Sequence, residues 1–424
     1  LAGHARQFQA PRDIAMTTIP LLTPGILITP YQQADGEPPR YLLELGDRHF
    51  LISPNTRALV LALAGSPVCE AALEAAYLSH GGTPLPAAQL VAQARNALPA
   101  ALFADAAPST GRAHPFTISL QLLSPRHAGA VSSRLAWLFT PALAWPLVAL
   151  FIALHACTLP EAMRTAHMDW SGGVGAQLTG LLLLSGLIHE LGHSAACRYF
   201  GCTHGAIGFG LYLIFPAWYA DVSKAWRLAP RQRAVVDLGG VYFQALLLIG
   251  IDLYALASGS ALAYKLTWLI TFTMLFTLNP VFKFDGYWLL SDLSGLHNLH
   301  RQVRSAAARL LLRLLGRAPA APVAPILLAY GLMSGAYMMY FISYLVMEIR
   351  RMGHTLPGAV SDGLHHLQFA GGEPSVSTGM SAGAVTGELL WAAVISSACI
   401  FLAAKIWRSV VELRQALVQA RTHH

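Results

Sequence analysis

Hydrophobic and polar positions divide the chain into two regions. Up to about residue 110, apolar runs are short and are broken by Pro and Gly, whereas long apolar blocks follow one another beyond it. Each long block is close to the roughly 20 residues that cross the hydrocarbon core of a bilayer as a helix. The pattern predicts six membrane-spanning helices, at residues 135–156, 176–198, 234–257, 263–281, 324–347 and 388–407.

The first region predicts a small α/β unit. Residues 41–53, YLLELGDRHFLIS, form two apolar runs around Gly46-Asp47, which is the strongest short signal for a β-hairpin. Three helical patterns with start and stop signals follow, at residues 54–65, 69–82 and 87–98. We therefore expect a cytosolic, winged-helix-like domain in this region. The predicted organisation is a domain at 1–110, a linker at 111–134, a membrane domain at 135–410 and a tail at 411–424.

One apolar stretch does not fit a spanning helix. Residues 205–219, GAIGFGLYLIFPAWY, are too few, are rich in Gly and contain Pro216. Non-helical backbone within a membrane must be sheltered by protein, because lipid offers no hydrogen bonds. The stretch predicts a re-entrant hairpin, with an edge strand at 207–214 to which another chain can add.

Composition and charge favour a membrane protein and argue against a nucleic-acid-binding protein. The chain is 55% hydrophobic and 12% charged, whereas soluble domains carry about 25% charged residues. The net charge is +7, but no basic run or RNA-binding signature occurs, so we expect no nucleic-acid partner. Lys and Arg gather instead in segments 198–233 and 282–323 and in the tail, which is typical of cytoplasmic loops. This predicts an integral protein of a bacterial inner (plasma) membrane with both termini cytoplasmic; only the Arg350-Arg351 pair disagrees.

The stretch SGLIHELGHSAAC, residues 185–197, places three titratable side chains inside the second predicted span. His189 and His193 are four residues apart, so one helix face carries both imidazoles, which can share one Zn²⁺. Glu190 lies beside such an ion and can accept a proton from its water, as in metalloproteases. Ionisable groups within a span are costly and usually mark function. A metal site is therefore favoured over two buried structural histidines.

A catalytic zinc ion needs a third protein ligand and an open position. Asp285, in FTLNPVFKFDGYWLLSD, follows the fourth predicted span at the same inner depth as HELGH. Asn279-Pro280 breaks the helix before it, and Gly286 lets the backbone turn. Asp285 is thus the favoured ligand, but five other side chains on the inner side stay open as alternatives: His204, Asp221, Asp237, His297 and His300. The nearby Cys197 and Cys202 are expected to be buried free thiols and not ligands.

These motifs together resemble the site-2 protease family of intramembrane zinc metalloproteases, and in particular its branch of peptide zinc metalloproteases. HELGH, ADVSKAW and FDGYWLLSDL carry the resemblance, which covers residues 176–300. The resemblance implies that the zinc ligands are His189, His193 and Asp285, and that Glu190 is the catalytic glutamate.

The resemblance also implies where substrate binds. The family's Asn-Pro element corresponds to Asn279 and Pro280, and its asparagine helps to hold the scissile carbonyl. The family's re-entrant hairpin presents substrate as an added strand; the corresponding residues here are Gly208, Phe209, Gly210 and Leu211. Two positions depart from the family pattern: Lys283 places a charge near the ligand, and Phe284 stands where many members have Leu.

The N-terminal region has a separate resemblance. LLELGDRHFLISPNTRALVLALAGSPVCEAALEAAY is similar to the small peptide-recognition domains of ribosomal-peptide maturation systems, known from the pyrroloquinoline quinone pathway. Those domains bind a leader peptide by strand addition on a winged-helix scaffold. A general cytosolic regulatory domain is the alternative interpretation.

Three functional hypotheses follow. The first is a zinc-dependent intramembrane endopeptidase that cleaves a membrane-associated peptide or protein near the cytosolic face, with a ribosomally made peptide as the favoured substrate. The second is a non-catalytic membrane protein that binds peptides or assists export; a structural zinc ion would not need Glu190. The third is a proton or metal transporter, which is disfavoured because the polar groups gather at one depth. The sequence does not predict an oligomeric state.

Overall fold

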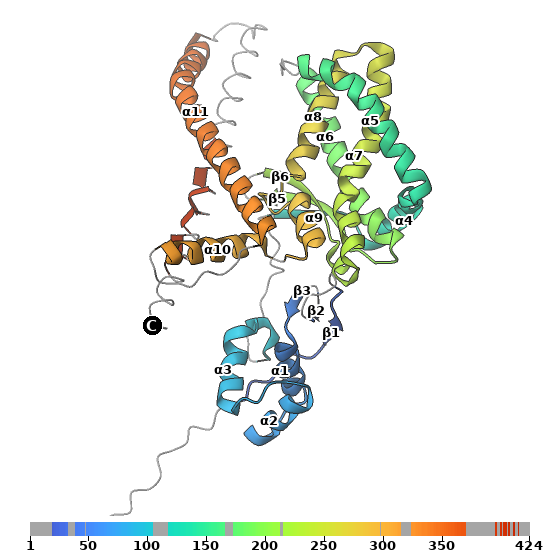
Figure 1. Cartoon of the computed structure of the whole chain (residues 1–424). Coiled ribbons are helices and arrows are strands. Elements are labelled where there is room, and N and C mark those ends of the chain that lie inside the picture. The colour runs from blue at the N-terminus through green and yellow to red at the C-terminus, as the bar shows by residue number, and fades with distance from the viewer. Residues whose placement is uncertain are drawn as a thin grey trace, which may run out of the picture. The chain divides into compact units, whose positions relative to one another are not determined.

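The structure is a computed structural model and describes residues 19–32, 39–46, 48–104, 118–165, 173–212, 215–296, 298–314, 324–369 and single positions between 395 and 414. The chain divides into two compact units, Leu1–His114 and Pro115–His424. Figure 1 shows the elements of both units along the chain.

The N-terminal unit combines a small sheet with three helices. Its strands pair antiparallel in the order β1-β2-β3, and Gly46, with a φ of +57°, makes the turn between β2 and β3. The expected hairpin and helices are present, whereas β1 was not expected. The elements are β1 (Ile26–Pro30), β2 (Tyr41–Leu45), β3 (Arg48–Ile52), α1 (Pro54–Ala64), α2 (Glu70–Ser79), α3 (Ala87–Ala97) and the 3-10 turn η1 (Ala100–Leu102).

Local signals explain why these helices begin where they do, and one core holds them together. At the start of α1, the Ser53 hydroxyl accepts a hydrogen bond from the backbone N–H of Thr56, and Pro54 occupies the first turn. Leu59, Leu73 and Leu90, one from each helix, are almost completely buried in one apolar cluster with residues of the sheet. The N-terminal unit therefore has a hydrophobic core of its own.

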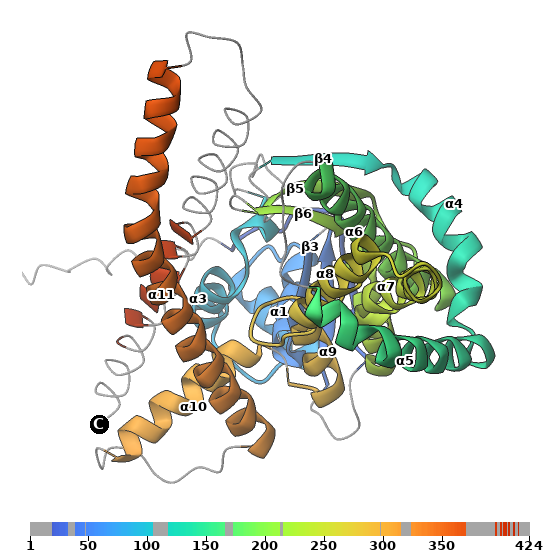
Figure 2. The same cartoon turned by 90° about the horizontal axis from the view of Figure 1, so that it is seen from above.

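The second unit is mostly helical. Helices α5, α6, α7 and α8 run side by side as a bundle, which Figure 2 shows from above, and α7 packs against α5, α6, α8 and α9. Leu178, Leu248 and Ile270 form an apolar core between α6, α7 and α8. The helices are α4 (Pro125–Leu135), α5 (Pro141–Arg164), α6 (Gly173–Tyr199), α7 (Pro230–Ser258), α8 (Ala261–Thr277), α9 (Asp285–Ser294), α10 (Leu299–Leu314) and α11 (Pro325–Phe369), with the 3-10 turns η2 (Ala136–Phe139) and η3 (Ser223–Arg227).

Within the described residues, three helices are long and apolar enough to cross a membrane: α5, α7 and the Pro325–His354 part of α11. Helix α8 is also apolar but has 17 residues, and α6 covers the predicted span that contains HELGH. The predicted span at 388–407 lies mostly outside the described residues. Six spans therefore stay a prediction. Helix α11 continues through Arg350 and Arg351, so this discordant pair lies on a helix and not in the loop that the prediction required.

A second sheet contains the stretch that was expected to form a re-entrant hairpin. Its strands are β4 (Ile118–Leu123), β5 (Ile207–Tyr212) and β6 (Phe215–Ala220), in the order β4-β5-β6. The hairpin of β5 and β6 is present, but the prediction of an edge strand at 207–214 is wrong, because β4 pairs with the other side of β5. The sequence interpretation placed β4 and α4 in a linker. Whether the hairpin enters a membrane stays a prediction.

Candidate metal centre

Helix α6 presents the two histidines of HELGH on one face. The four-residue spacing brings their rings to 4.7 Å between centroids, and the two Nε2 atoms lie 3.1 Å apart. Both residues are 7% exposed. Leu187, Leu191, Ala195 and Ala196, in and around the motif, favour a helix.

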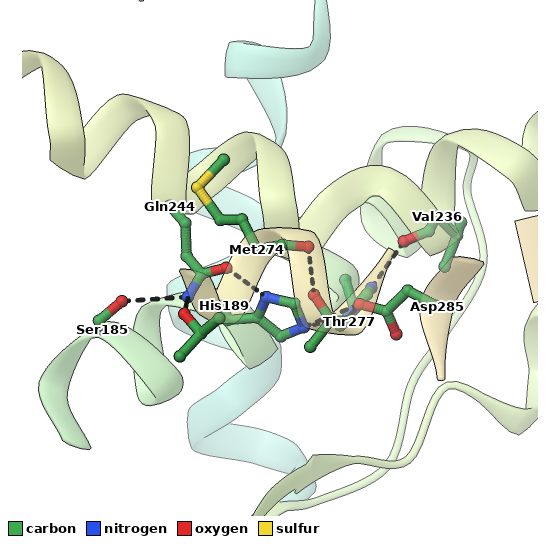
Figure 3. Close-up of polar contacts among 9 residues, drawn as sticks. Ser185, His189, Val236, Gln244, Met274, Thr277 and Asp285 are labelled. Carbon is green, nitrogen blue, oxygen red and sulfur yellow. Dashed lines mark hydrogen bonds and ion pairs between the residues drawn. The ribbon is translucent and has the colours of Figure 1, made fainter. Parts of the chain in front are cut away.

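Helix α7 fixes the orientation of both imidazoles. The Nδ1 atom of His193 lies 2.7 Å from the backbone oxygen of Val236, which can only accept, so Nδ1 carries the proton. The Nδ1 atom of His189 lies 3.0 Å from Oε1 of Gln244. The Gln244 amide nitrogen donates to the hydroxyl of Ser185 at 3.1 Å, which turns its oxygen toward His189. Figure 3 shows this amide between Ser185 and His189. In a neutral imidazole whose proton lies on Nδ1, the Nε2 atom presents a lone pair to a metal ion.

Asp285 completes the group from a different helix. It is the first residue of α9, where the helix dipole favours a carboxylate. Its Oδ2 lies 3.0 Å from Nε2 of His189 and 3.5 Å from Nε2 of His193, and the ligand atoms of the three residues lie within 4.8 Å of one another.

The donor set fits a zinc ion. Oδ2 of Asp285 is buried and has no hydrogen-bond donor, while the neighbouring Nε2 atoms present lone pairs. Two imidazole nitrogens and a carboxylate oxygen that converge in a buried place repel one another unless a metal ion or a proton lies between them. Two imidazoles and one carboxylate form a ligand set of the kind that catalytic zinc sites use. The arrangement also has the hydrogen bonds behind the ligands that orient metal-binding histidines.

Two glycines allow the helices to approach this closely. A Cβ atom on Gly240 of α7 would lie 2.5 Å from the His189 ring, so only glycine leaves room for the imidazole. A Cβ atom on Gly286 would lie 1.9 Å from the backbone oxygen of Leu278. The glycine after Asp285 is therefore required by the close contact of α9 with the end of α8.

Glu190 lies beside the group but is not part of it. It is half-buried, and the backbone of Ala220, the last residue of β6, is within hydrogen-bonding reach of its carboxyl. One turn earlier on α6, the Trp218 ring of β6 covers Gly186. The strand β6 therefore packs along α6 up to the level of Glu190.

Among the described residues, the alternative third ligands have other partners or lie outside the group. The ring of His204 contacts the Ser132 hydroxyl and the Gly205 backbone oxygen, Asp221 accepts from Ser223, and His300 contacts the Val281 backbone oxygen. Asp237 lies near His193 and Asp285 but outside the group of ligand atoms. His297 lies outside the described residues. Cys197 and Cys202 are buried free thiols, as expected.

The residues predicted to bind substrate lie in two places, the Asn-Pro element before Asp285 and the strand β5. The Asn279 side-chain oxygen accepts from the backbone N–H of Val281 at 3.0 Å, and the Pro280 carbonyl accepts from the Tyr330 hydroxyl at 3.0 Å. The Asn279 side chain thus closes a turn with Val281 shortly before Asp285. Its role toward a scissile carbonyl stays a prediction. Residues 208–211 lie in the central strand β5 and are paired on both sides.

Sequence reasoning missed the residues behind the ligands. Gln244, Ser185 and the Val236 carbonyl belong to no motif, and Gln244 is 55 residues from His189. One signal was present: a glutamine four residues after Gly240, inside an otherwise apolar span.

A comparison with known proteins finds one distant relative whose name agrees with a zinc site. The chain is 24% identical over 139 residues to protein YydH of Bacillus subtilis (strain 168), which is named provisionally as a peptide zinc metalloprotease. The match covers 32% of this chain and 54% of the relative, so the chain spans about half the length of that protein. No family model and no solved structure matches. The likeness supports a metalloprotease at the general level.

Proposed function

We propose that the protein is a zinc-dependent intramembrane endopeptidase that cleaves a membrane-associated peptide or protein near the cytosolic face. The observation that carries the proposal is the convergence of His189, His193 and Asp285 beside Glu190, with their facing atoms 3.0–3.5 Å apart. The apolar helices α5, α7 and α11 support a location in a membrane. The distant relative supports zinc and proteolysis.

In this proposal the chain's residues hold the metal and move one proton. His189, His193 and Asp285 would hold the ion, while Gln244 and Val236 keep the imidazoles in the tautomer that binds it. When bound, zinc supplies Lewis-acid chemistry, which polarises a peptide carbonyl and acidifies water. Glu190 accepts a proton from the attacking water and returns it to the leaving amine. A non-catalytic zinc site would have no use for this carboxylate.

The free edge of β6 is the place where we expect substrate to bind. The backbone N–H and C=O of Asp221 point back to β5, and successive residues of a strand alternate in direction. The backbone groups of Trp218 therefore point to the edge of β6 that is unpaired among the described residues. At the end of this edge, the Ala220 carbonyl accepts from the backbone N–H of Val222, and the Ala220 backbone meets Glu190. A substrate strand on this edge would pass the catalytic carboxylate. The binding strand proposed here is thus β6 instead of β5.

The N-terminal unit is proposed to bind the leader of a ribosomally made peptide. Its sheet has the order β1-β2-β3, so β1 and β3 are the outer strands, and a peptide strand can add to an outer strand of a sheet. This interpretation rests on the resemblance of its sequence.

The test compares wild type with Glu190→Gln and Asp285→Ala. Full-length protein in detergent is analysed for bound zinc and is then incubated with single-span membrane peptides that carry a fluorophore pair. We expect Glu190→Gln to retain zinc and to lose at least about 100-fold in cleavage rate, because general-base catalysis contributes about 10²–10⁴-fold. Asp285→Ala should lose zinc as well as activity.

Three results would contradict the proposal. Cleavage by Glu190→Gln at the wild-type rate would remove the proposed base. Zinc in the wild type without cleavage of any peptide would favour the non-catalytic alternative, and unchanged zinc in Asp285→Ala would exclude Asp285 as a ligand.

A further inference from the structure

The short helix α9 carries two carboxylates with different partners. Asp285 and Asp292 are seven residues apart, so they share one face of the helix and lie roughly 10 Å apart along its axis. Asp285 faces the two histidines. Asp292 faces α7, where Nε of Arg233 donates to its Oδ1 at 2.9 Å.

This second contact is a buried ion pair, and neighbouring groups hold its guanidinium in place. Arg233 is 4% exposed and Asp292 is 9% exposed. The Arg233 Nη1 atom also donates to the backbone oxygen of Leu228 at 2.8 Å, and its guanidinium carbon lies 6.0 Å from the Trp226 ring. Trp226 in turn meets Trp288 of α9 edge-on, at 5.7 Å between ring centroids. The Arg233–Asp292 ion pair is therefore held in one geometry.

The same helix that supplies Arg233 also orients the two imidazoles. Arg233, Val236, Gly240 and Gln244 are spaced by three or four residues, so they lie on one side of α7. Val236 and Gln244 accept from the histidines. The position of the histidines and the position of α9 are thus both set relative to α7.

Helix α9 depends on this docking. It has ten residues, and helices shorter than about 12–15 residues are marginal by themselves in water. The segment before it contains no regular helix or strand between Thr277 and Asp285. Where Asp285 lies relative to the imidazoles therefore depends on how α9 is held against α7.

We propose that the Arg233–Asp292 ion pair positions Asp285 for metal binding, so that Arg233 and Asp292 are positioning residues of the zinc site. This rests on the proposed function, because it assumes that Asp285 is a metal ligand. The pair does not touch the metal; it acts through the placement of α9.

The test uses Co²⁺ as the metal and the full-length protein in detergent. The double variant Arg233→Met with Asp292→Leu replaces the pair by apolar side chains, which folded proteins tolerate better than one unpaired buried charge. The single variant Asp292→Asn is measured beside it. The control is Asp252→Asn, which changes another buried carboxylate of α7 that pairs with His155, away from α9. Titrations follow the visible absorption of bound Co²⁺, and thermal unfolding of the metal-free protein reports the fold.

We expect the double variant to unfold as a cooperative protein but to bind Co²⁺ about 10- to 100-fold more weakly, because residues behind the ligands have effects of that size. The absorption bands should also change, since the carboxylate ligand is displaced. Asp252→Asn should keep the wild-type affinity and bands.

The outcomes separate this inference from the proposed function. Wild-type affinity and bands in a folded double variant would overturn the positioning role and leave the zinc site intact. An equal loss in Asp252→Asn would overturn it too, because any buried change would then have the effect. If the double variant does not fold, Asp292→Asn decides between the same two results. A wild type that binds no Co²⁺ would overturn both the inference and the proposed function.

Discussion

At the scale of single residues, the site depends on where two protons lie. The backbone oxygen of Val236 and the amide oxygen of Gln244 hold the protons on Nδ1 of His193 and His189. The spacing of HELGH was sufficient to pair the histidines, since four residues make one helical turn. The acceptors could not be predicted, because they belong to another helix and follow no local pattern. Asp285 could be favoured from its place after a span but not separated from its alternatives until the helices were in position.

Gln244 offers a direct test of this orientation. Gln244→Leu removes the acceptor for His189, and we expect its zinc affinity to fall by about 10- to 100-fold. Gln244→Glu keeps an acceptor at the same place and is the matched control, so it should bind zinc within a few-fold of wild type. Competition with a chromophoric chelator measures both. Equal affinities in the Leu and Glu variants would show that the amide does not orient the ring.

At the scale of elements, the sequence analysis misses β4 and α4. Residues 111–134 contain no long apolar block, so the pattern of long blocks predicts a linker there. Residues 116–122, FTISLQL, nevertheless alternate between apolar and polar side chains, which is the pattern of a strand, and in the structure β4 pairs with β5. Helix α4 is joined to the segment after α6 by Ser132, whose hydroxyl lies 2.6 Å from Nε2 of His204. Helices with strong local signals, such as α1 with its Ser53 cap, were predicted correctly.

The contact between α4 and His204 predicts a dependence on pH. Burial lowers the pKa of His204 below 6.5, and the nearby Arg198 adds to the effect. The unfolded chain therefore binds the proton more readily, so this contribution to stability is present above about pH 6.5 and is lost as the pH falls. We expect the melting temperature of metal-free wild type to fall more between pH 7.5 and 5.5 than that of His204→Gln. Parallel curves for the two proteins would contradict the assignment.

At the scale of the whole molecule, each unit has its own core, and polar contacts add to the apolar ones in the bundle. Asp252 of α7 is fully buried and accepts from Nδ1 of His155 on α5 at 3.0 Å and from the Thr267 hydroxyl on α8 at 2.9 Å. One carboxylate thus joins three helices. Apolar blocks predicted that these helices exist, but such blocks carry no information about which helix packs against which.

Removal of the Asp252 charge should weaken the bundle without changing the metal site. We expect Asp252→Asn to lower the free energy of unfolding by about 1–2 kcal/mol, since one amide cannot replace both contacts and hydrogen bonds between membrane helices have modest net effects. Unfolding in mixed detergent micelles measures the change. Leu253→Ala, which alters an exposed neighbour, is the control, and an equal loss in both variants would show that the carboxylate has no special role.

Helix α7 gives no ligand to the candidate zinc site, yet the orientation of the imidazoles depends on which side of α7 faces them. Each residue of a helix advances the chain by about 100°, and the groups at Arg233, Val236, Gly240 and Gln244 face one direction only because their spacing adds up to whole turns. A single residue gained or lost between Val236 and Gln244 would turn one imidazole acceptor away while the other stayed in place. An insertion or a deletion in this stretch of α7 would therefore disturb the site, whereas a substitution that keeps the helix leaves the spacing of these groups unchanged.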